Sequence, residues 1–334
     1  VDHAFMSHER PFVLVIPARG PAAALVPNLE LGSWELVGFE GAVFDWRDQT
    51  GYDDAFAALM QHLNITSLAV EGQVMRVFVH HALKKAQPDL RIIDAEREIS
   101  APRMIKTEAE VAALQKAIDI SERALRATLD SVKLGQTEKE IEQKLVQMIF
   151  AEGADDLSFA PIVAAGDGSA RPHAKAREDY HVKAGDALLI DFGARKDGFA
   201  ADITRTVFLA HVSDEGRAVY DTVLRANLAG LEATRAGVTA HEIDDVVTGV
   251  LEASPFADRI RTKTGHGLGR DVHEAPYIMR GNHMTLPAGT VYTNEPGLYE
   301  IGNFGVRIED DVLITEDGYK SLTNFPKELM VLPC

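Results

Sequence analysis

Four acidic residues and one histidine stand on short apolar segments of this sequence, where charged side chains are uncommon. They are Asp191 in ALLIDF, Asp202 in FAADITRT, His266 in TGHGLG, Glu295 in VYTNEPG and Glu309 in VRIEDDVLI. Four carboxylates and one imidazole suit two divalent cations that are bridged by carboxylates and a solvent oxygen. Because oxygen ligands dominate, this set favours Mn²⁺ or Co²⁺, with Fe²⁺ or Zn²⁺ as alternatives.

Asp191 and Asp202 fall on the two arms of a predicted β-hairpin. The run ALLID predicts the first strand, RKDG the turn and ITRTVFL the second strand. If the turn is centred between Lys196 and Asp197, Asp191 lies directly opposite Asp202, whereas a one-residue shift makes them a diagonal pair. Two like charges there are destabilising unless one is protonated, both are solvated or a cation lies between them. On this stretch alone, a solvated hairpin rim stays open as the alternative.

Glu309 stands in FGVRIEDDVLIT, which alternates as a buried β-strand does. Apolar residues occupy one face, and Asp310 is the exception on it, whereas Arg307, Glu309 and Asp311 share the other face. An arginine beside the acids would offset the remaining negative charge of a buried metal site. An ordinary salt bridge on a strand is the alternative for Arg307.

The sequence divides into two regions with different patterns of apolar residues, and the five residues all lie in the second. Residues 1–105 alternate short strands and helices, which predicts a small α/β domain, and residues 106–334 predict a larger α+β domain. In the larger domain we expect two helices before the hairpin and two after it. Three begin with a capping box, in which a threonine precedes a glutamate by three positions, and one begins with a serine. These helices begin at Thr107, Thr137, Ser213 and Thr239.

The smaller domain is predicted from short runs. Strands are expected at PFVLVIP, LVGFEGAVFDW, SLAVEG and LRIID, and helices at Tyr52–Leu63 and VFVHHALKKA. The segment APRMIK is predicted to be a linker between the two domains.

The composition excludes several classes of protein. Of 334 residues, 46% are apolar and 25% are charged, and no apolar run is long enough for a membrane span. The net charge of −17, without a cluster of basic residues, argues against a nucleic-acid partner. The one cysteine, Cys334, excludes an internal disulfide framework and favours a reducing cytoplasm. The N-terminal stretch has no basic region of the kind that opens a signal peptide.

The segments DFGARKDGFAADITRT, GHGLGRDVHE, NEPG and VRIEDDVLIT, in this order, resemble the metallopeptidases of the clan of methionine aminopeptidase, aminopeptidase P and prolidase. The resemblance covers about residues 106 to 330 and implies a "pita-bread" catalytic domain. The extra N-terminal domain resembles that of prolidases, aminopeptidases P and creatinases, and methionine aminopeptidases lack it. The resemblance also implies a homodimer.

The resemblance implies roles for individual residues. Asp202 and Glu309 bridge the two metal ions, Asp191 completes one ion, and His266 and Glu295 complete the other. Glu295 is also the proton shuttle for a hydroxide that bridges the metals.

Three further residues take catalytic roles by resemblance. His173, in SARPHAKA, and His273, in DVHE, hold the substrate carbonyl and stabilise the oxyanion, and Arg307 supports the metal acids. The sequence departs from the pattern at Thr262, where many relatives carry another histidine. Substrate binding near proline is therefore built differently here, with Arg270 or a residue of the N-terminal domain as candidates.

The leading hypothesis is a dinuclear-metal peptidase that cleaves Xaa-Pro dipeptides before proline. Aminopeptidase P, which acts on longer Xaa-Pro peptides, is the alternative, because the closure of the pocket beyond proline cannot be read from the sequence. A creatinase or a non-catalytic binding module should have lost metal ligands, and all five are present here.

Overall fold

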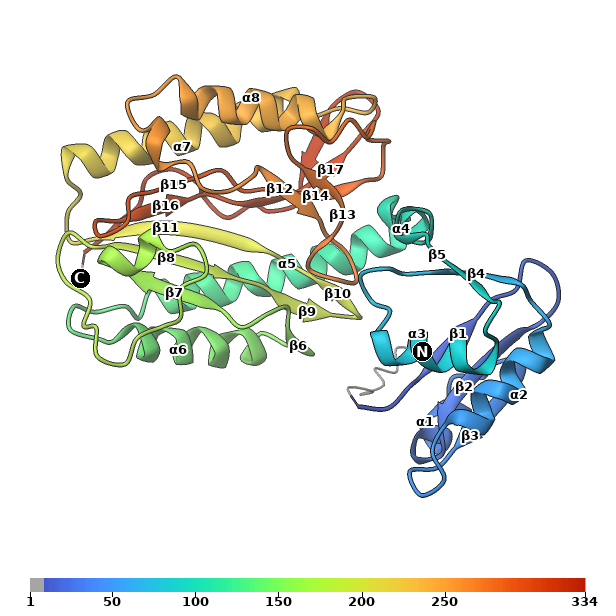
Figure 1. Ribbon diagram of the computed structural model, residues 1–334. Coiled ribbons are helices and arrows are strands. Elements are labelled where there is room, and N and C mark those ends of the chain that lie inside the picture. Colours follow the sequence, from blue (N-terminus) through green and yellow to red (C-terminus); the bar gives the residue numbers. More distant parts are fainter. Residues whose placement is uncertain (1–8, 334) are drawn as a thin grey trace. The chain divides into compact units, whose positions relative to one another are not determined.

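The computed structural model describes residues 9–333. Residues 1–8 and Cys334 lie outside the described residues. The predictions that depend on them, namely no signal peptide, no disulfide framework and a reducing cytoplasm, therefore stay predictions. The chain forms two compact units, one ending at Ile99 and the other beginning at Ser100 (Figure 1). Within residues 9–333, no helix combines the length and the apolar character that crossing a lipid bilayer requires.

The first unit contains a three-stranded sheet and a separate pair of parallel strands. Its elements are β1 (Val13–Val15), β2 (Ala22–Pro27), η1 (Asn28–Glu30), α1 (Leu31–Glu35), β3 (Gly41–Trp46), α2 (Asp53–Leu63), β4 (Ser67–Val70), α3 (Val77–Ala86) and β5 (Arg91–Asp94). Strand β2 lies in the middle of the sheet, antiparallel to β1 and parallel to β3, and β4 pairs with β5. Helices α2 and α3 bury Phe56, Leu59 and Leu83 in one core with Leu25 of β2. The predicted α/β character of this region is confirmed.

The prediction of the first unit was wrong in three places. It missed β2, whose sequence AAALVP shows no alternation because nearly all of its residues are buried. It began the strand LVGFEGAVFDW at Leu36, whereas the structure has a turn at residues 36–38 after α1 and begins β3 at Gly41. It also interpreted APRMIK as a linker, although its first four residues belong to α4 (Glu96–Met104).

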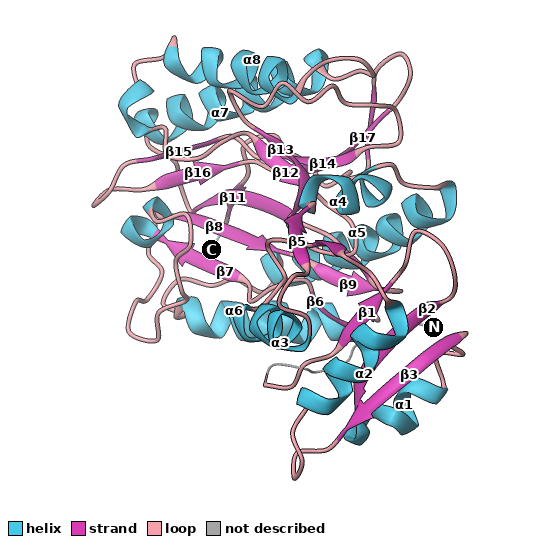
Figure 2. Ribbon diagram, turned by 45° about the vertical axis from the view of Figure 1, so that its right-hand side comes forward, coloured by secondary structure: helices cyan, strands magenta, loops and turns pink. Residues whose placement is uncertain are grey.

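Four long helices enclose the strands of the second unit. Helices α5 (Glu108–Leu129) and α6 (Glu138–Ala151) lie on one side, and α7 (Asp214–Ala233) and α8 (Ala240–Glu252) lie on the other (Figures 1 and 2). The capping boxes predicted at Thr107, Thr137 and Thr239 are all present, and Ser213 accepts a hydrogen bond from the backbone of Gly216. These caps satisfy backbone N–H groups that have no partner within the helix, which explains why the helix starts could be predicted.

The strands between the helices form two principal sheets. One has the order β19-β11-β8-β7 and the other β13-β12-β14-β17-β18, and smaller ladders join β15 to β16 and β6, β9 and β10 to one another. The bounds are β6 (Asp156–Leu157), β7 (Ile162–Ala165), β8 (Ala187–Phe192), β9 (Ala194–Lys196), β10 (Phe199–Ala200), β11 (Ile203–Leu209), β12 (Gly265–Gly267), β13 (Glu274–Ile278), β14 (Val291–Asn294), β15 (Gly297–Tyr299), β16 (Gly305–Arg307), β17 (Asp310–Ile314), β18 (Tyr319–Ser321) and β19 (Val331–Leu332). Short 3-10 helices are η2 (Gly166–Ala170) and η3 (Ala257–Arg259).

The turn of the hairpin that contains Asp191 and Asp202 is centred one residue later than predicted, between Asp197 and Gly198. Asp197 and Gly198 form the turn, with φ angles of 51° and 79°, as a two-residue type I′ turn requires. Asp191 therefore lies opposite Thr204, and direct pairing of Asp191 with Asp202 is wrong. Asp202 is instead the diagonal neighbour of Asp191, which was the stated consequence of a one-residue shift.

The segment FGVRIEDDVLIT is not a single strand. It divides into β16, which pairs with β15, and β17, which pairs with β14 and β18. Ile308 and Glu309 lie between them, and the backbone N–H of Glu309 donates to the carbonyl of Thr204 at 3.1 Å. This break lets one short segment reach both principal sheets.

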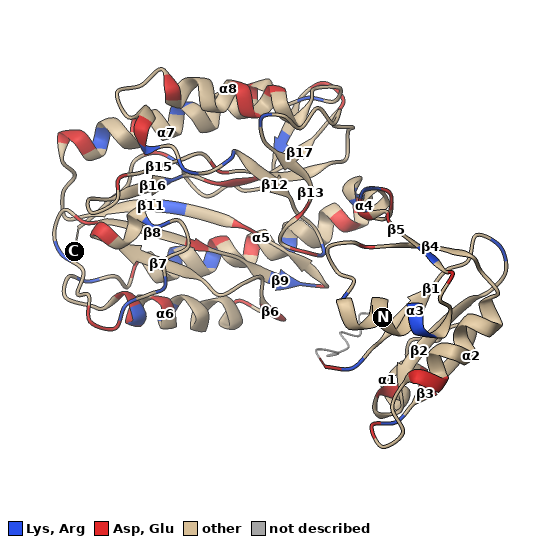
Figure 3. Cartoon of the chain, viewed as in Figure 1, with Lys and Arg blue, Asp and Glu red and all other residues tan. Residues whose placement is uncertain are grey.

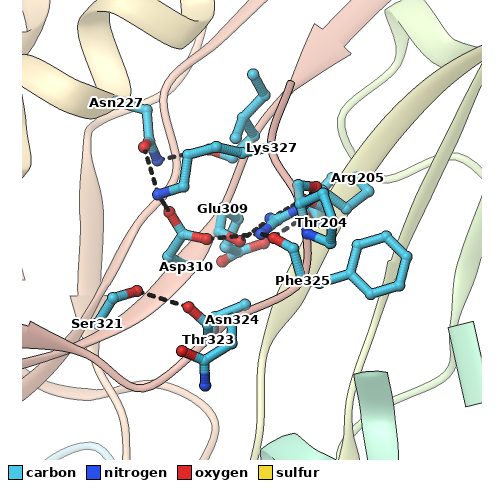
Figure 4. Close-up of polar contacts among 12 residues, drawn as sticks. Thr204, Arg205, Asn227, Glu309, Asp310, Ser321, Thr323, Asn324, Phe325 and Lys327 are labelled. Carbon is cyan, nitrogen blue, oxygen red and sulfur yellow. Dashed lines mark hydrogen bonds and ion pairs between the residues drawn. The ribbon is translucent and has the colours of Figure 1, made fainter. Parts of the chain in front are cut away.

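Several charged residues of the second unit are buried, and Figure 3 marks charged residues along β11 and neighbouring strands. The guanidinium of Arg205 donates to Asp310 Oδ1 at 2.8 Å and to the carbonyls of Glu309 and Phe325, each at 2.6 Å (Figure 4). Lys327 binds the other oxygen of Asp310 and reaches Asn227 Oδ1 at 3.2 Å. The side chains of Arg205 and Asp310 are 2% and 0% exposed, so this is a buried ion pair.

We expect Arg205→Met to lower the free energy of unfolding by about 3–5 kcal/mol, because it leaves the buried Asp310 without its main partner. Arg123→Met is the matched control, since Arg123 pairs with Glu152 on the surface and such pairs contribute about 0–1 kcal/mol. Urea denaturation of both variants measures the difference. Equal effects of the two substitutions would contradict a structural role for the buried pair.

Candidate metal centre

The five candidate ligands come from five segments that converge between the two principal sheets. Asp191 is in β8, His266 is in β12, Asp202 and Glu309 immediately precede β11 and β17, and Glu295 immediately follows β14. One ligand atom from each of Asp202, His266 and Glu309 lies within 4.8 Å of the others. His266 Nε2 is 3.6 Å from Asp202 Oδ2 and 3.3 Å from Glu295 Oε1. Asp202, His266 and Glu309 are therefore within reach of one another, Glu295 contacts His266, and Asp191 joins them through Arg307.

The acids of this cluster lack enough positive charge to balance them. Burial raises the pKa of Asp202 and of Glu309 well above the usual range, and neighbouring carboxylates raise both values further. Burial also raises the pKa of Glu295 to about 7. Within the described residues, Asp191 Oδ1 and Glu309 Oε1 are buried without a hydrogen-bond partner. Buried carboxylate oxygens without a hydrogen-bond partner fit a divalent cation, which would neutralise their charge and occupy their lone pairs.

His266 is oriented as a metal ligand should be. Its Nδ1 lies 3.1 Å from the carbonyl of Gly267, and since a carbonyl only accepts hydrogen bonds, Nδ1 must carry the proton. The lone pair of Nε2 then faces Asp202 and Glu295, an arrangement that is repulsive without a cation between them. Burial lowers the pKa of His266 to about 3, so the imidazole is neutral. The glycine at 265 is needed here, because a Cβ atom would lie 1.7 Å from the carbonyl oxygen of Thr293.

Arg307 connects the acids of the cluster. Its guanidinium pairs with Asp191 Oδ2, donates to the Tyr299 hydroxyl at 2.8 Å and donates to Thr204 Oγ1 at 3.0 Å. The Thr204 hydroxyl in turn donates to Glu309 Oε2. Arg307 thus contacts one acid directly and another through Thr204, which is more than an isolated salt bridge on a strand.

Sequence reasoning missed several residues that hold the candidate ligands. Thr204 had a detectable signal, because it stands two positions after Asp202 and so shares its face of the strand. Tyr299 and Arg205 had none, since their contacts depend on pairings between distant segments. Asp311 accepts a hydrogen bond from the backbone of Asp202 at 3.2 Å, and burial raises the pKa of Asp311 well above the usual range.

The two histidines with predicted substrate roles lie at a more accessible edge. His273 is exposed, and its ring centroid is 4.0 Å from that of His266. His173 is also exposed, and its charge is among the causes that lower the pKa of His273, after burial and Lys263. Both histidines are thus near the cluster without being buried in it.

The residue after His273 is anchored by a buried ion pair. Lys106 Nζ donates to Glu274 Oε1 at 2.6 Å, and these side chains are only 2% and 6% exposed. Arg103 donates to the other oxygen of Glu274 at 2.8 Å and to Asp271 at 2.7 Å. The loop that carries His273 is therefore held on both sides of this residue, at Asp271 and at Glu274.

Comparison with known proteins gives two family matches. Residues 112–316 match the model of metallopeptidase family M24, and residues 5–105 match the creatinase/prolidase N-terminal domain. A Xaa-Pro dipeptidase of Pyrococcus furiosus is 34% identical over 269 residues, which cover 80% of this chain and 76% of that protein.

Solved structures of similar proteins include a prolidase and an aminopeptidase. A prolidase from Thermococcus sibiricus has 34% identity and a TM-score of 0.93, and the match covers 99% of this chain and 90% of that one. An X-Pro aminopeptidase from Thermotoga maritima also has 34% identity, with a TM-score of 0.84 and coverage of 93% and 86%. Both similarities extend over both units of this chain.

We expect Mn²⁺ at about 100 times its dissociation constant to raise the melting temperature by about 5–10 °C, since binding to the native state alone contributes about 2.7 kcal/mol. Asp202→Asn should reduce this gain to less than about 2 °C. Because folding raises the pKa of Asp202, the metal-free protein loses stability as the pH rises from the ordinary pKa of this carboxyl towards its raised value. Metal-free Asp202→Asn should therefore melt higher than metal-free wild type at pH 8.

Differential scanning fluorimetry with and without a chelator measures all four states. Asp317→Asn is the control, because it removes the charge of an exposed acid outside the cluster. An equal Mn²⁺ gain in wild type and Asp202→Asn would contradict the assignment of Asp202 as a ligand.

Proposed function

This chain belongs to metallopeptidase family M24, and from that premise we propose that it hydrolyses the peptide bond before proline in Xaa-Pro dipeptides. A creatinase-type N-terminal domain precedes a pita-bread catalytic domain. The observation that carries the proposal is the buried group of Asp202, His266 and Glu309, with Glu295 in contact and Asp191 linked through Arg307. The names of the Pyrococcus furiosus and Thermococcus sibiricus relatives support the dipeptide substrate.

The donor set supports two divalent ions per chain, with Mn²⁺ as the proposed metal because carboxylate oxygens outnumber nitrogen ligands. Asp202 and Glu309 would be shared between the ions, Asp191 would complete one, and His266 and Glu295 the other. When bound, such a pair supplies a water molecule of lowered pKa and polarises the scissile carbonyl. Proton transfer and stabilisation of the oxyanion are then carried out by side chains of this protein.

Glu295 is the proposed proton shuttle. Burial holds its pKa at about 7 without metal, while its side chain keeps 15% exposure, which leaves an approach for substrate. Thr293 Oγ1 donates to Glu295 Oε1 at 3.2 Å and fixes its orientation. Glu295 would take the proton that the attacking water loses and give it to the proline nitrogen as the C–N bond breaks. A prolyl nitrogen carries no N–H of its own, so this proton is needed for it to leave as a neutral amine.

His273 and His173 are proposed to stabilise the negative charge that develops on the carbonyl oxygen. Partial desolvation by the surrounding protein lowers the pKa of His273, which favours a neutral imidazole that donates through one nitrogen. The Lys106–Glu274 pair holds the loop that carries His273, so the donor is positioned before substrate binds.

Cleavage of longer Xaa-Pro peptides is the second candidate, and the similarity to an X-Pro aminopeptidase favours it. The homodimer and the cytoplasmic location stay predictions from sequence.

We expect the Mn²⁺-loaded protein to release proline from Ala-Pro faster than it cleaves Ala-Pro-Ala, and chelation to abolish both reactions. Product formation is followed by chromatography after metal is stripped and restored. Preference for the tripeptide would move the function to aminopeptidase P. Inactivity on both peptides with Mn²⁺, Co²⁺ and Zn²⁺ would contradict the peptidase function.

Glu295→Gln should lower kcat by about 10²–10⁴-fold at saturating Mn²⁺, because glutamine cannot transfer the proton. Metal content of the purified variant separates this loss from loss of a ligand. Glu316→Gln, at an exposed position, is the control and should match wild type. A loss that excess Mn²⁺ fully restores would show that Glu295 acts only as a ligand.

A further inference from the structure

Lys263 is a charged residue near the site to which the proposed reaction assigns no role. It stands three residues before His266 on the segment that enters β12, and its side chain is partly buried. Its Nζ lies 5.8 Å from the centroid of the Tyr277 ring. Tyr277 is the ladder partner of His266, and directly opposed residues project from the same face of a sheet. The ammonium is therefore held over a ring that adjoins the candidate metal ligand.

The charge of Lys263 acts on three residues of the site. It is one of the causes that lower the pKa of His273 and of His266, and it opposes the rise in the pKa of Glu295. They agree with the position of the ammonium over Tyr277, opposite His266, near the residues that are proposed to contact substrate.

The other cations near the cluster are already engaged. Arg307 binds Asp191, Tyr299 and Thr204. Arg270, which the sequence suggested for substrate binding, stacks on Phe199 with its guanidinium 4.8 Å from the ring centroid. By contrast, within the described part of the chain the ammonium of Lys263 forms neither an ion pair nor a hydrogen bond. An aromatic face holds such a cation only weakly, so the ammonium can exchange this contact for an anion.

We propose that Lys263 binds the C-terminal carboxylate of the substrate and thereby selects dipeptides. This inference rests on the proposed function. In an Xaa-Pro dipeptide only the Cα atom of proline separates the scissile nitrogen from the carboxylate carbon, so an anion-binding group must lie beside the reacting atoms. A lysine ammonium on a flexible side chain is a compact cation suited to that place.

The same contact would exclude longer peptides. A tripeptide presents a neutral amide where a dipeptide presents its carboxylate, so the charge-assisted hydrogen bond is lost. A site built for a charged partner rejects an analogue that lacks it, because its own group is left unpaired. Thr262, the adjacent residue, has a buried hydroxyl without a hydrogen-bond partner among the described residues, and it could donate to the second carboxylate oxygen.

The test compares Ala-Pro with Ala-Pro-NH₂, which differ only in the carboxylate, using Mn²⁺-loaded wild type, Lys263→Met and Lys263→Arg. Wild type should prefer Ala-Pro in kcat/KM by about 30-fold or more. Lys263→Met should reduce this preference to less than about threefold, mainly through a higher KM for Ala-Pro, while cleavage of the amide changes little. Lys263→Arg should keep most of the preference, since it retains the charge.

Arg261→Met is the matched control. Arg261 is an exposed cation two residues away whose guanidinium donates to the carbonyls of Asp258 and Ile260. It should keep the wild-type preference. Cleavage of the amide substrate by Lys263→Met also reports that the variant is folded and loaded, and Lys263→Gln replaces it if the methionine variant is insoluble.

Two results overturn the proposal, and they can be told apart. If wild type cleaves Ala-Pro and the Lys263 variants keep its preference for the carboxylate, the dipeptidase stands and the role of Lys263 fails. If wild type cleaves neither Ala-Pro nor Ala-Pro-Ala, the proposed function fails and the role of Lys263 fails with it.

Discussion

The burial of more carboxylates than internal cations can neutralise is the constraint on which the catalytic unit depends. Arg205 and Lys327 both bind Asp310, and Arg307 binds Asp191. The carboxylates of Asp202, Glu309 and Glu295 face one another and a neutral histidine instead. Of the cations buried in the described part of the chain, Arg307 alone pairs with the carboxylate of a candidate ligand, and one positive charge cannot balance four carboxylates. Divalent ions from solution are suited to fill this deficit of positive charge.

The arrangement separates stability from reactivity. Asp310 is paired with Arg205 and Lys327. Arg205 also donates to the backbone carbonyl of Glu309 and so holds this candidate ligand in place. The residues with proposed substrate roles lie at the accessible edge, where His273, His173 and Lys263 are exposed or partly buried. Rigid ion pairs behind the cluster thus fix ligands, while the groups that would meet the substrate keep the freedom to exchange partners.

Local rules in the sequence predicted what local interactions decide. The helix starts at Thr107, Thr137 and Thr239 followed from capping boxes, which involve only four consecutive residues. The hairpin register was one turn position off, because the turn was centred before Asp197, although the pair Asp197-Gly198 is itself typical of a type I′ turn with two positive φ angles. The division of β16 from β17 was missed, since it arises from pairing with two different sheets. The support of Asp191 by Tyr299 and Arg307, and of Glu309 by Thr204, likewise depends on segments that are far apart in the chain.

Anomalous diffraction at the manganese edge, from crystals of the Mn²⁺-loaded protein, tests the central claim most directly. Two peaks per chain are predicted, enclosed by Asp191, Asp202, His266, Glu295 and Glu309. A single peak, or peaks away from these side chains, would contradict the view that the charge deficit at this site is filled by a pair of divalent ions.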